Sequence, residues 1–185
     1  MPHTYKDQTV HLGPYGDPDK LNVDALTRPG ELGKSFESND RGYQIVQVDS
    51  SCVAANVAGI VATNDLAFWK DKDKYLVTND SRSCLGHPTV DSANGAFRQF
   101  VAGVFRCAAT AGYYCCVLHR GDNIPIASAS TSVDVGDQVV ATTGTGADVV
   151  NVASGTALTV KPIGVARSVG TGALLYTDVD IQPAP

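Results

Sequence analysis

Two cysteines in this sequence are each followed three residues later by a histidine, a spacing that can chelate a metal ion from a loop or a helix. The pairs are Cys84 with His87 and Cys116 with His119. The second pair falls in an apolar run typical of a strand, where positions three apart point to opposite faces. The first pair lies in a loop and supplies only two ligands. We therefore predict no metal site.

The segment Gly30-Glu31-Leu32-Gly33-Lys34-Ser35 looks like the end of a phosphate-binding loop. The full motif needs a glycine where this chain has Arg28, a buried strand before it and a helix after it, so that backbone amides can meet the phosphates. The sequence predicts none of the three. We interpret the segment as a turn and predict that the protein binds no nucleotide and no other cofactor.

A nucleophilic enzyme needs a serine or cysteine brought together with a histidine and a carboxylate. Of the four histidines, His3 and His11 lie near the N-terminus, which leaves His87 and His119 as candidate bases of a small hydrolase. The sequence has no strand–turn–helix nucleophile elbow. Aspartates of the C-terminal half, which a glycosidase would pair, are equally expected at turns and on wet strand faces. We predict that the protein has no catalytic residues and is not an enzyme.

Composition and charge exclude further classes. The 185 residues carry a formal net charge of -5 and no block of Lys and Arg that would follow a phosphate backbone, so we predict no direct binding of nucleic acid. No apolar run approaches the roughly 20 residues of a membrane span, and the first residues lack the apolar core of a secretory signal. We expect no membrane association. The five cysteines form an odd set without a CxxC pair, and we interpret them as reduced core residues.

Residues 1–42 differ in composition from the rest, because turn-forming residues such as Gly13-Pro14 and Pro29-Gly30 punctuate a segment with few apolar side chains. Such a segment cannot bury enough surface to hold itself together. We predict an extended N-terminal arm over 1–42 and a β domain over 43–185. The arm is either a loose tail or a strap that docks on a neighbouring subunit, and isolated apolar residues favour the second. The candidate contacts to a subunit or larger partner are Leu12, Tyr15, Leu21, Val23, Leu26 and Phe36.

From Tyr43 onward, short apolar runs alternate with turns at a spacing of about ten residues, which is typical of an antiparallel β-sandwich or β-barrel. We therefore predict an all-β fold. The last run, Ala173–Ile181, alternates most clearly, with Tyr176 on the wet face. The expected runs are Tyr43–Val48, Val57–Thr63, Tyr75–Thr78, Phe100–Arg106, Gly112–His119, Gln138–Thr142, Ala147–Val152, Leu158–Ala166 and Ala173–Ile181, and those from Gln138 onward are expected to form a meander.

A Gly-Val-x-Arg sequence occurs twice, at Gly103-Val104-Phe105-Arg106 and at Gly164-Val165-Ala166-Arg167, each time followed by small residues and another apolar run. The match predicts a β unit used twice, with each strand returning after a turn. We interpret the two glycines as places where strands bend or cross closely, and the two arginines as anchors for carbonyl or carboxylate groups within the fold.

Aromatic residues flank the charge alternation of residues 70–74, with Phe68 and Trp69 before it and Tyr75 after it. Trp69 and Tyr75 are candidates for a surface contact with a sugar or a protein, because aromatic side chains beside exposed charges often bind. The alternative is a hairpin tip with a core aromatic at its base. Sequence alone does not decide between them.

Residues 135–181 resemble the small head-decoration, or capsid-cement, proteins of tailed bacteriophages. The resemblance rests on Gln138-Val139-Val140, the return Val149-Val150-Asn151-Val152, and Lys161-Pro162-Ile163-Gly164-Val165-Ala166 followed by Gly172 and an apolar strand. It implies a structural virion protein, made in the host cytoplasm, that binds the outside of an assembled capsid. The implied partners are the major capsid protein and further copies of this chain, as a trimer. A receptor- or carbohydrate-binding module of a phage tail or fibre is the alternative.

Overall fold

The computed structural model describes residues 16–26, 30–54, 57–84, 101–128, 133–141, 149–151, 162–170 and 174–181. The fold is all-β, as predicted, and the only helical elements within these ranges are two 3-10 turns, η2 (Pro18–Lys20) and η3 (Ser81–Ser83). The strands are β1 (Asn22–Val23), β2 (Ser35–Ser38), β3 (Arg41–Val48), β4 (Val53–Ala54), β5 (Val57–Ala58), β6 (Ile60–Val61), β7 (Leu66–Asp71), β8 (Leu76–Thr78), β9 (Val101–Phe105), β10 (Ala109–Thr110), β11 (Tyr114–Ala127), β12 (Gln138–Ala141), β13 (Val149–Asn151), β14 (Gly164–Ala166) and β15 (Leu174–Asp180).

Five of these strands close into a small barrel. β3 pairs with β11, β11 with β9, β9 with β7, β7 with β8, and β8 returns to β3. The β3–β8 pair is parallel and the other four are antiparallel. Closure joins the strands in a ring and removes the open edges that a flat sheet would leave.

The barrel interior is apolar and buried. One core cluster draws side chains from all five barrel strands, whereas the other contains none from β8 and extends to Leu21 and Ile163, so we assign the first cluster to the barrel interior. Val61 and Ala109, from the β6–β10 pair, belong to the same interior cluster. The interior residues of the barrel strands are Val46, Val48, Ala67, Trp69, Val77, Ala102, Phe105, Cys115 and Val117.

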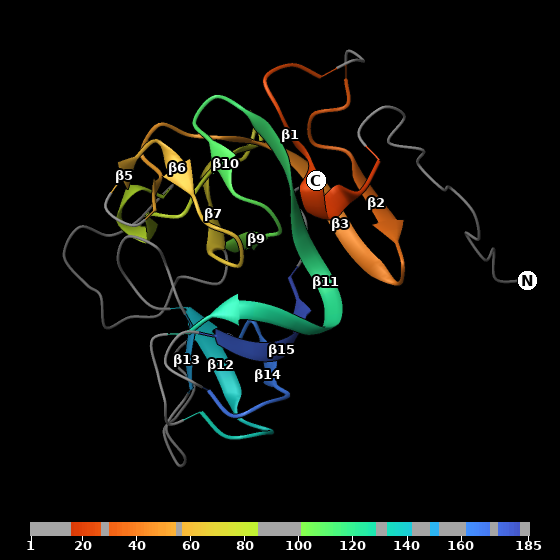
Figure 1. The fold of residues 1–185 in the computed structure, drawn as a ribbon, viewed down its shortest axis with the longest axis vertical. Coiled ribbons are helices and arrows are strands. Elements are labelled where there is room, and N and C mark those ends of the chain that lie inside the picture. Colours follow the sequence, from red (N-terminus) through yellow and green to blue (C-terminus); the bar gives the residue numbers. More distant parts are fainter. Residues whose placement is uncertain are drawn as a thin grey trace, which may run out of the picture.

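Strand β11 joins the barrel to the rest of one 11-stranded sheet, and we call the strands beyond the barrel the second sheet. Its first half lies in the barrel, and its second half pairs with β15 across a register shift between Gly121 and Ile124. In Figure 1, β11 descends along the barrel and then turns beneath it to run beside β15. The strand order beyond the barrel is β13-β12-β14-β15-β11. The expected meander is therefore wrong in its connections, because β14 pairs with β12 and leaves β13 at the edge.

The two Gly-Val-x-Arg sequences occupy equivalent positions. Val104 pairs with Leu118, and Val165 pairs with Asp178. A Cβ built on Gly103 would lie 2.5 Å from the carbonyl oxygen of Leu118, and one on Gly164 would overlap the carbonyl oxygen of Asp178. Gly103 therefore lies close to the backbone of the residue that pairs with Val104, and Gly164 lies close to the backbone of the residue that pairs with Val165. This confirms the prediction that strands approach closely at both glycines.

The N-terminal segment is built into the domain over its described residues. β1 pairs with the beginning of β11, and β2 forms a hairpin with β3. The hairpin turns at Asn39 and Asp40, both with positive φ, as the two-residue turns that suit twisted strands require. β1 and β2, which lie before the expected division at residue 42, therefore pair with strands of the expected β domain. Residues 1–15 lie outside the described residues.

Most of the expected apolar runs contain a strand of the structure, whereas β7 falls in none of them. Its residues alternate between the two core clusters, with Leu66 and Phe68 in one and Ala67 and Trp69 in the other. A strand buried on both faces shows no polar alternation. The run Leu158–Ala166 is described only from residue 162, and Ala147–Val152 only over β13.

Candidate docking face

Four large apolar side chains are exposed in the described part of the chain, and all four lie on or beside the β14–β15 hairpin. Val165 and Tyr176 lie on its outer face, with exposed fractions of 37% and 40%. Val135 and Val169 lie in adjoining turns and are 64% and 55% exposed. Single exposed apolar residues are ordinary, whereas several on one surface indicate a contact site.

Backbone hydrogen bonds hold the two turns side by side. The amide of Gly136 donates to the carbonyl of Ala166 at 2.9 Å, and the amide of Gly170 donates to the carbonyl of Val133 at 2.9 Å. Gly136 has a φ of +94°, which suits glycine at the corner of the first turn. The turns therefore present Val135 and Val169 from neighbouring positions.

The outer face of the hairpin combines these apolar groups with one ion pair. Asp178 lies opposite Val165, and the amide of Arg167 donates to the carbonyl of Tyr176 at 2.7 Å. The side chain of Arg167 forms a hydrogen bond and an ion pair with Asp178, which lowers the pKa of that carboxyl group. This arginine anchors a carboxylate of its own fold, as the sequence predicted.

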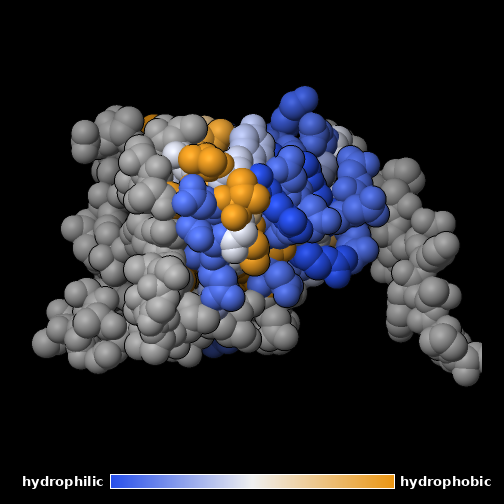
Figure 2. Space-filling view, turned by 90° about the horizontal axis from the view of Figure 1, so that it is seen from below, coloured by the Kyte–Doolittle hydropathy of each residue, from blue (hydrophilic) through white to orange (hydrophobic). Residues whose placement is uncertain are grey.

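We call this surface the β14–β15 face and define it by its residues. Figure 2 views the molecule from the side of the second sheet and shows apolar side chains gathered between hydrophilic ones. Pro125 of β11 is the strand neighbour of Tyr176 and is half-buried. The β14–β15 face consists of Arg120, Asp122, Pro125, Asp134, Val135, Asp137, Gln138, Val165, Arg167, Val169, Tyr176, Asp178 and Asp180.

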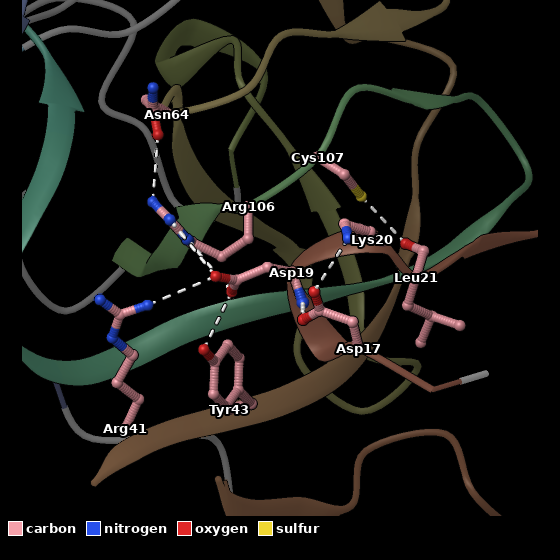
Figure 3. Close-up of polar contacts among 9 residues, drawn as sticks. All are labelled: Asp17, Asp19, Lys20, Leu21, Arg41, Tyr43, Asn64, Arg106 and Cys107. Carbon is pink, nitrogen blue, oxygen red and sulfur yellow. Dashed lines mark hydrogen bonds and ion pairs between the residues drawn. The ribbon is translucent and has the colours of Figure 1, made fainter. Parts of the chain in front are cut away.

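A polar network fastens η2, which lies within the expected N-terminal arm, to the barrel (Figure 3). The carboxylate of Asp19 accepts a hydrogen bond from the hydroxyl of Tyr43 at 2.9 Å. It also forms ion pairs with Arg41 and Arg106, both at 3.3 Å. Arg106 donates a further bond to Asn64 at 3.1 Å. Arg106, like Arg167, therefore anchors a carboxylate within the fold.

Four of the six predicted contact residues lie in the described part of the chain. Leu21 and Phe36 are members of the core cluster outside the barrel, so their assignment to a capsid or subunit contact is corrected. Val23 and Leu26 are partly buried and pack against that cluster. Leu12 and Tyr15 lie outside the described residues, and their contact stays a prediction.

The aromatic candidates for a surface contact are held inside. Trp69 is 1% exposed and lies in the barrel interior, so the assignment of Trp69 to the surface is wrong. Tyr75 is half-buried, meets the Trp69 ring edge-on with centroids 6.5 Å apart, and lies over Gly33. The hairpin interpretation with a core aromatic at its base is the correct one for this stretch.

The histidine and cysteine side chains in the described ranges are buried, except for the half-buried Cys107. His119 is 9% exposed, its Nε2 has no hydrogen-bond partner among the described residues, and burial lowers its pKa. All five cysteines are free, as predicted, and burial raises the pKa of Cys52, Cys84 and Cys107 to about 11 each, so they are neutral thiols. His87 lies outside the described residues.

Comparison with protein-family models found no match to this sequence, and comparison with curated proteins found none either. Within the ranges that the structure describes, no three or more His, Cys, Asp or Glu side chains are grouped so as to hold a metal ion. No helix in those ranges is long and apolar enough to cross a membrane.

Sequence reasoning missed the β14–β15 face almost entirely. The alternation of β15 placed Tyr176 on the wet side, which was the one available signal. Valines such as Val135 and Val169 resemble core residues in sequence, and only the folded turns show that they are exposed.

Proposed function

We propose that this chain is a structural virion protein that binds the outside of an assembled tailed-phage capsid and stabilises it. The observation that supports the proposal is the concentration of exposed apolar side chains on the β14–β15 face. The four exposed apolar side chains of that face all lie within residues 135–181, the stretch that resembles head-decoration proteins. Apolar area at the centre of a contact, surrounded by polar groups, is typical of protein–protein interfaces.

The mechanism requires burial and hydrogen bonding only. Val135 and Val169 project from turns fixed by backbone hydrogen bonds, so little backbone conformational freedom is lost when a partner covers them. Many copies on one shell would convert modest single contacts into durable attachment. The proposed partners are the major capsid protein and other copies of this chain, with trimerisation still a prediction that light scattering would check.

The alternative of a receptor- or carbohydrate-binding module of a tail or fibre required an exposed aromatic surface around Trp69. Burial of Trp69 in the barrel takes that support away. Glycan affinity measured for the full chain would restore the alternative, and its absence is what we expect.

Cosedimentation with capsids that lack this chain tests the proposal. The full-length protein should pellet with the shells saturably and raise the temperature at which they release DNA. Val135→Asp should weaken binding at least about tenfold, because a charge at the centre of a contact must be desolvated. Thr110→Asp is the matched control, because Thr110 is exposed on β10 and the substitution adds the same charge away from the face. A folded wild-type chain that stays in the supernatant would rule the proposal out.

A further inference from the structure

The charges around the β14–β15 face are strongly unbalanced. Asp134 and Asp137 flank Val135 in the first turn. Asp178 and Asp180 share the outer side of β15 with Tyr176, because alternate residues of a strand point the same way. An acidic group therefore lies on each side of the apolar centre.

Asp122 adds a further negative charge beside this group. Its neighbour Asn123 donates its amide to Asp178 at 3.1 Å, and Asp122 acts electrostatically on Arg167. Five aspartates and two arginines among the face residues give the face a net charge of -3, and Arg120 is itself paired with Glu37. The whole chain has a formal net charge of -5, so the net negative charge of this one surface is more than half that of the chain.

The imbalance decides between two kinds of occupant. In a two-fold dimer, each patch meets its own copy, so aspartates would face aspartates across a contact that excludes water. Like charges placed opposite one another are destabilising, and the penalty grows where water is excluded. A second copy docked face to face is therefore disfavoured.

We infer that the β14–β15 face fits a protein surface that is apolar at its centre and basic at its rim. Val135, Val169 and Tyr176 meet the apolar part, and the aspartates meet lysine or arginine side chains around it. The inference rests on the proposed function only for the identity of that partner as the capsid. Rim charges of this kind govern the association rate and the choice of partner more than the final affinity.

Two synthetic probes test this chemistry without the capsid. One is an amphipathic peptide of leucine and lysine, and the other replaces every lysine by glutamate. The lysine peptide should bind the full-length chain and shift the amide resonances of β14, β15 and residues 134–137. Asp134→Lys should weaken it about threefold to tenfold, since each rim charge contributes modestly and reversal both removes attraction and adds repulsion.

Asp73→Lys is the matched control, because Asp73 is exposed in the β7–β8 turn and its reversal changes the net charge equally. If Asp73→Lys weakens the lysine peptide as much as Asp134→Lys does, attraction is nonspecific and the inference fails. It also fails if the glutamate peptide binds as tightly, or if the shifts map elsewhere.

The capsid experiment separates the two proposals. Sensitivity of capsid binding to Val135→Asp, without sensitivity to salt or to Asp134→Lys, keeps the proposed function and overturns the inference. A chain that ignores capsids yet binds the lysine peptide at this face keeps the inference and overturns the proposed function. Capsid binding weakened both by Asp134→Lys and by added salt supports both.

Discussion

Replacing Asp19 by alanine should destabilise the protein by about 3 kcal/mol. The carboxylate joins η2 to β3 and to the end of β9 through Tyr43, Arg41 and Arg106. A hydrogen bond to a charged group contributes about 1.5–3 kcal/mol, but the Asp19 side chain is 25% exposed and the three contacts share one acceptor, so they do not add. Arg106, only 11% exposed, would keep Asn64 as its remaining described partner.

Urea unfolding of the full-length chain measures this loss as a change in midpoint at constant slope. Asp17→Ala is the matched control in the same turn, because Asp17 caps the amide of Asp19 and pairs with the exposed Lys20. We expect the control to cost about 1 kcal/mol or less. Equal losses in the two variants would show that the Asp19 network does not hold the N-terminal segment.

Tyr43 supplies an independent readout of the same network. Its pKa is raised to about 12, first by burial and then by the hydrogen bond and charge of Asp19. In Asp19→Asn the pKa of Tyr43 should fall toward its ordinary value while burial keeps it above that value. Ultraviolet titration of the tyrosinate band measures the shift, and an unchanged pKa would contradict the contact.

Three further predictions concern stability. Gly164→Ala should cost about 3 kcal/mol in thermal or urea unfolding because its Cβ overlaps a backbone carbonyl, whereas Gly112→Ala, which has open space but a φ of +83°, should cost about 1 kcal/mol. Equal costs would discount the close approach. The folded-state pKa of His119 lies below 6.5, so the unfolded chain binds the proton first and stability should fall as pH drops from 6.5 toward the folded value; His119→Gln should lack that component. Deleting residues 1–26 should lower the urea midpoint by removing η2, β1 and the core residue Leu21.

Local patterns in the sequence predicted individual strands but not their partners. The alternation in β15 reproduces the observed burial residue by residue, because one face of that strand meets the core and the other meets water. The closure of the barrel depends on β3 pairing with β8 in parallel, and no local signal encodes a contact between strands so distant in sequence. The second role of β11 was hidden for the same reason, since its run was expected to end at His119.

The candidate site was harder to predict because exposure is a property of the fold. Trp69 stands beside alternating charges, which suggested a surface, yet its strand is buried on both faces. Leu21 and Phe36 occur in a segment with few apolar residues, which suggested an arm, yet both pack into the core of their own chain. Val135 and Val169 differ in the opposite direction, since valine is typical of a core and both are exposed.

Because β11 belongs to both the barrel and the second sheet, it also sets the mechanical path between them. A pull on the β14–β15 hairpin directed along its strands reaches the barrel through the antiparallel β15–β11 pair. Such a load acts in shear, so several interstrand hydrogen bonds resist together, whereas peeling would break them one at a time. A load applied at the proposed docking face would therefore meet several interstrand hydrogen bonds of the β15–β11 pair at once.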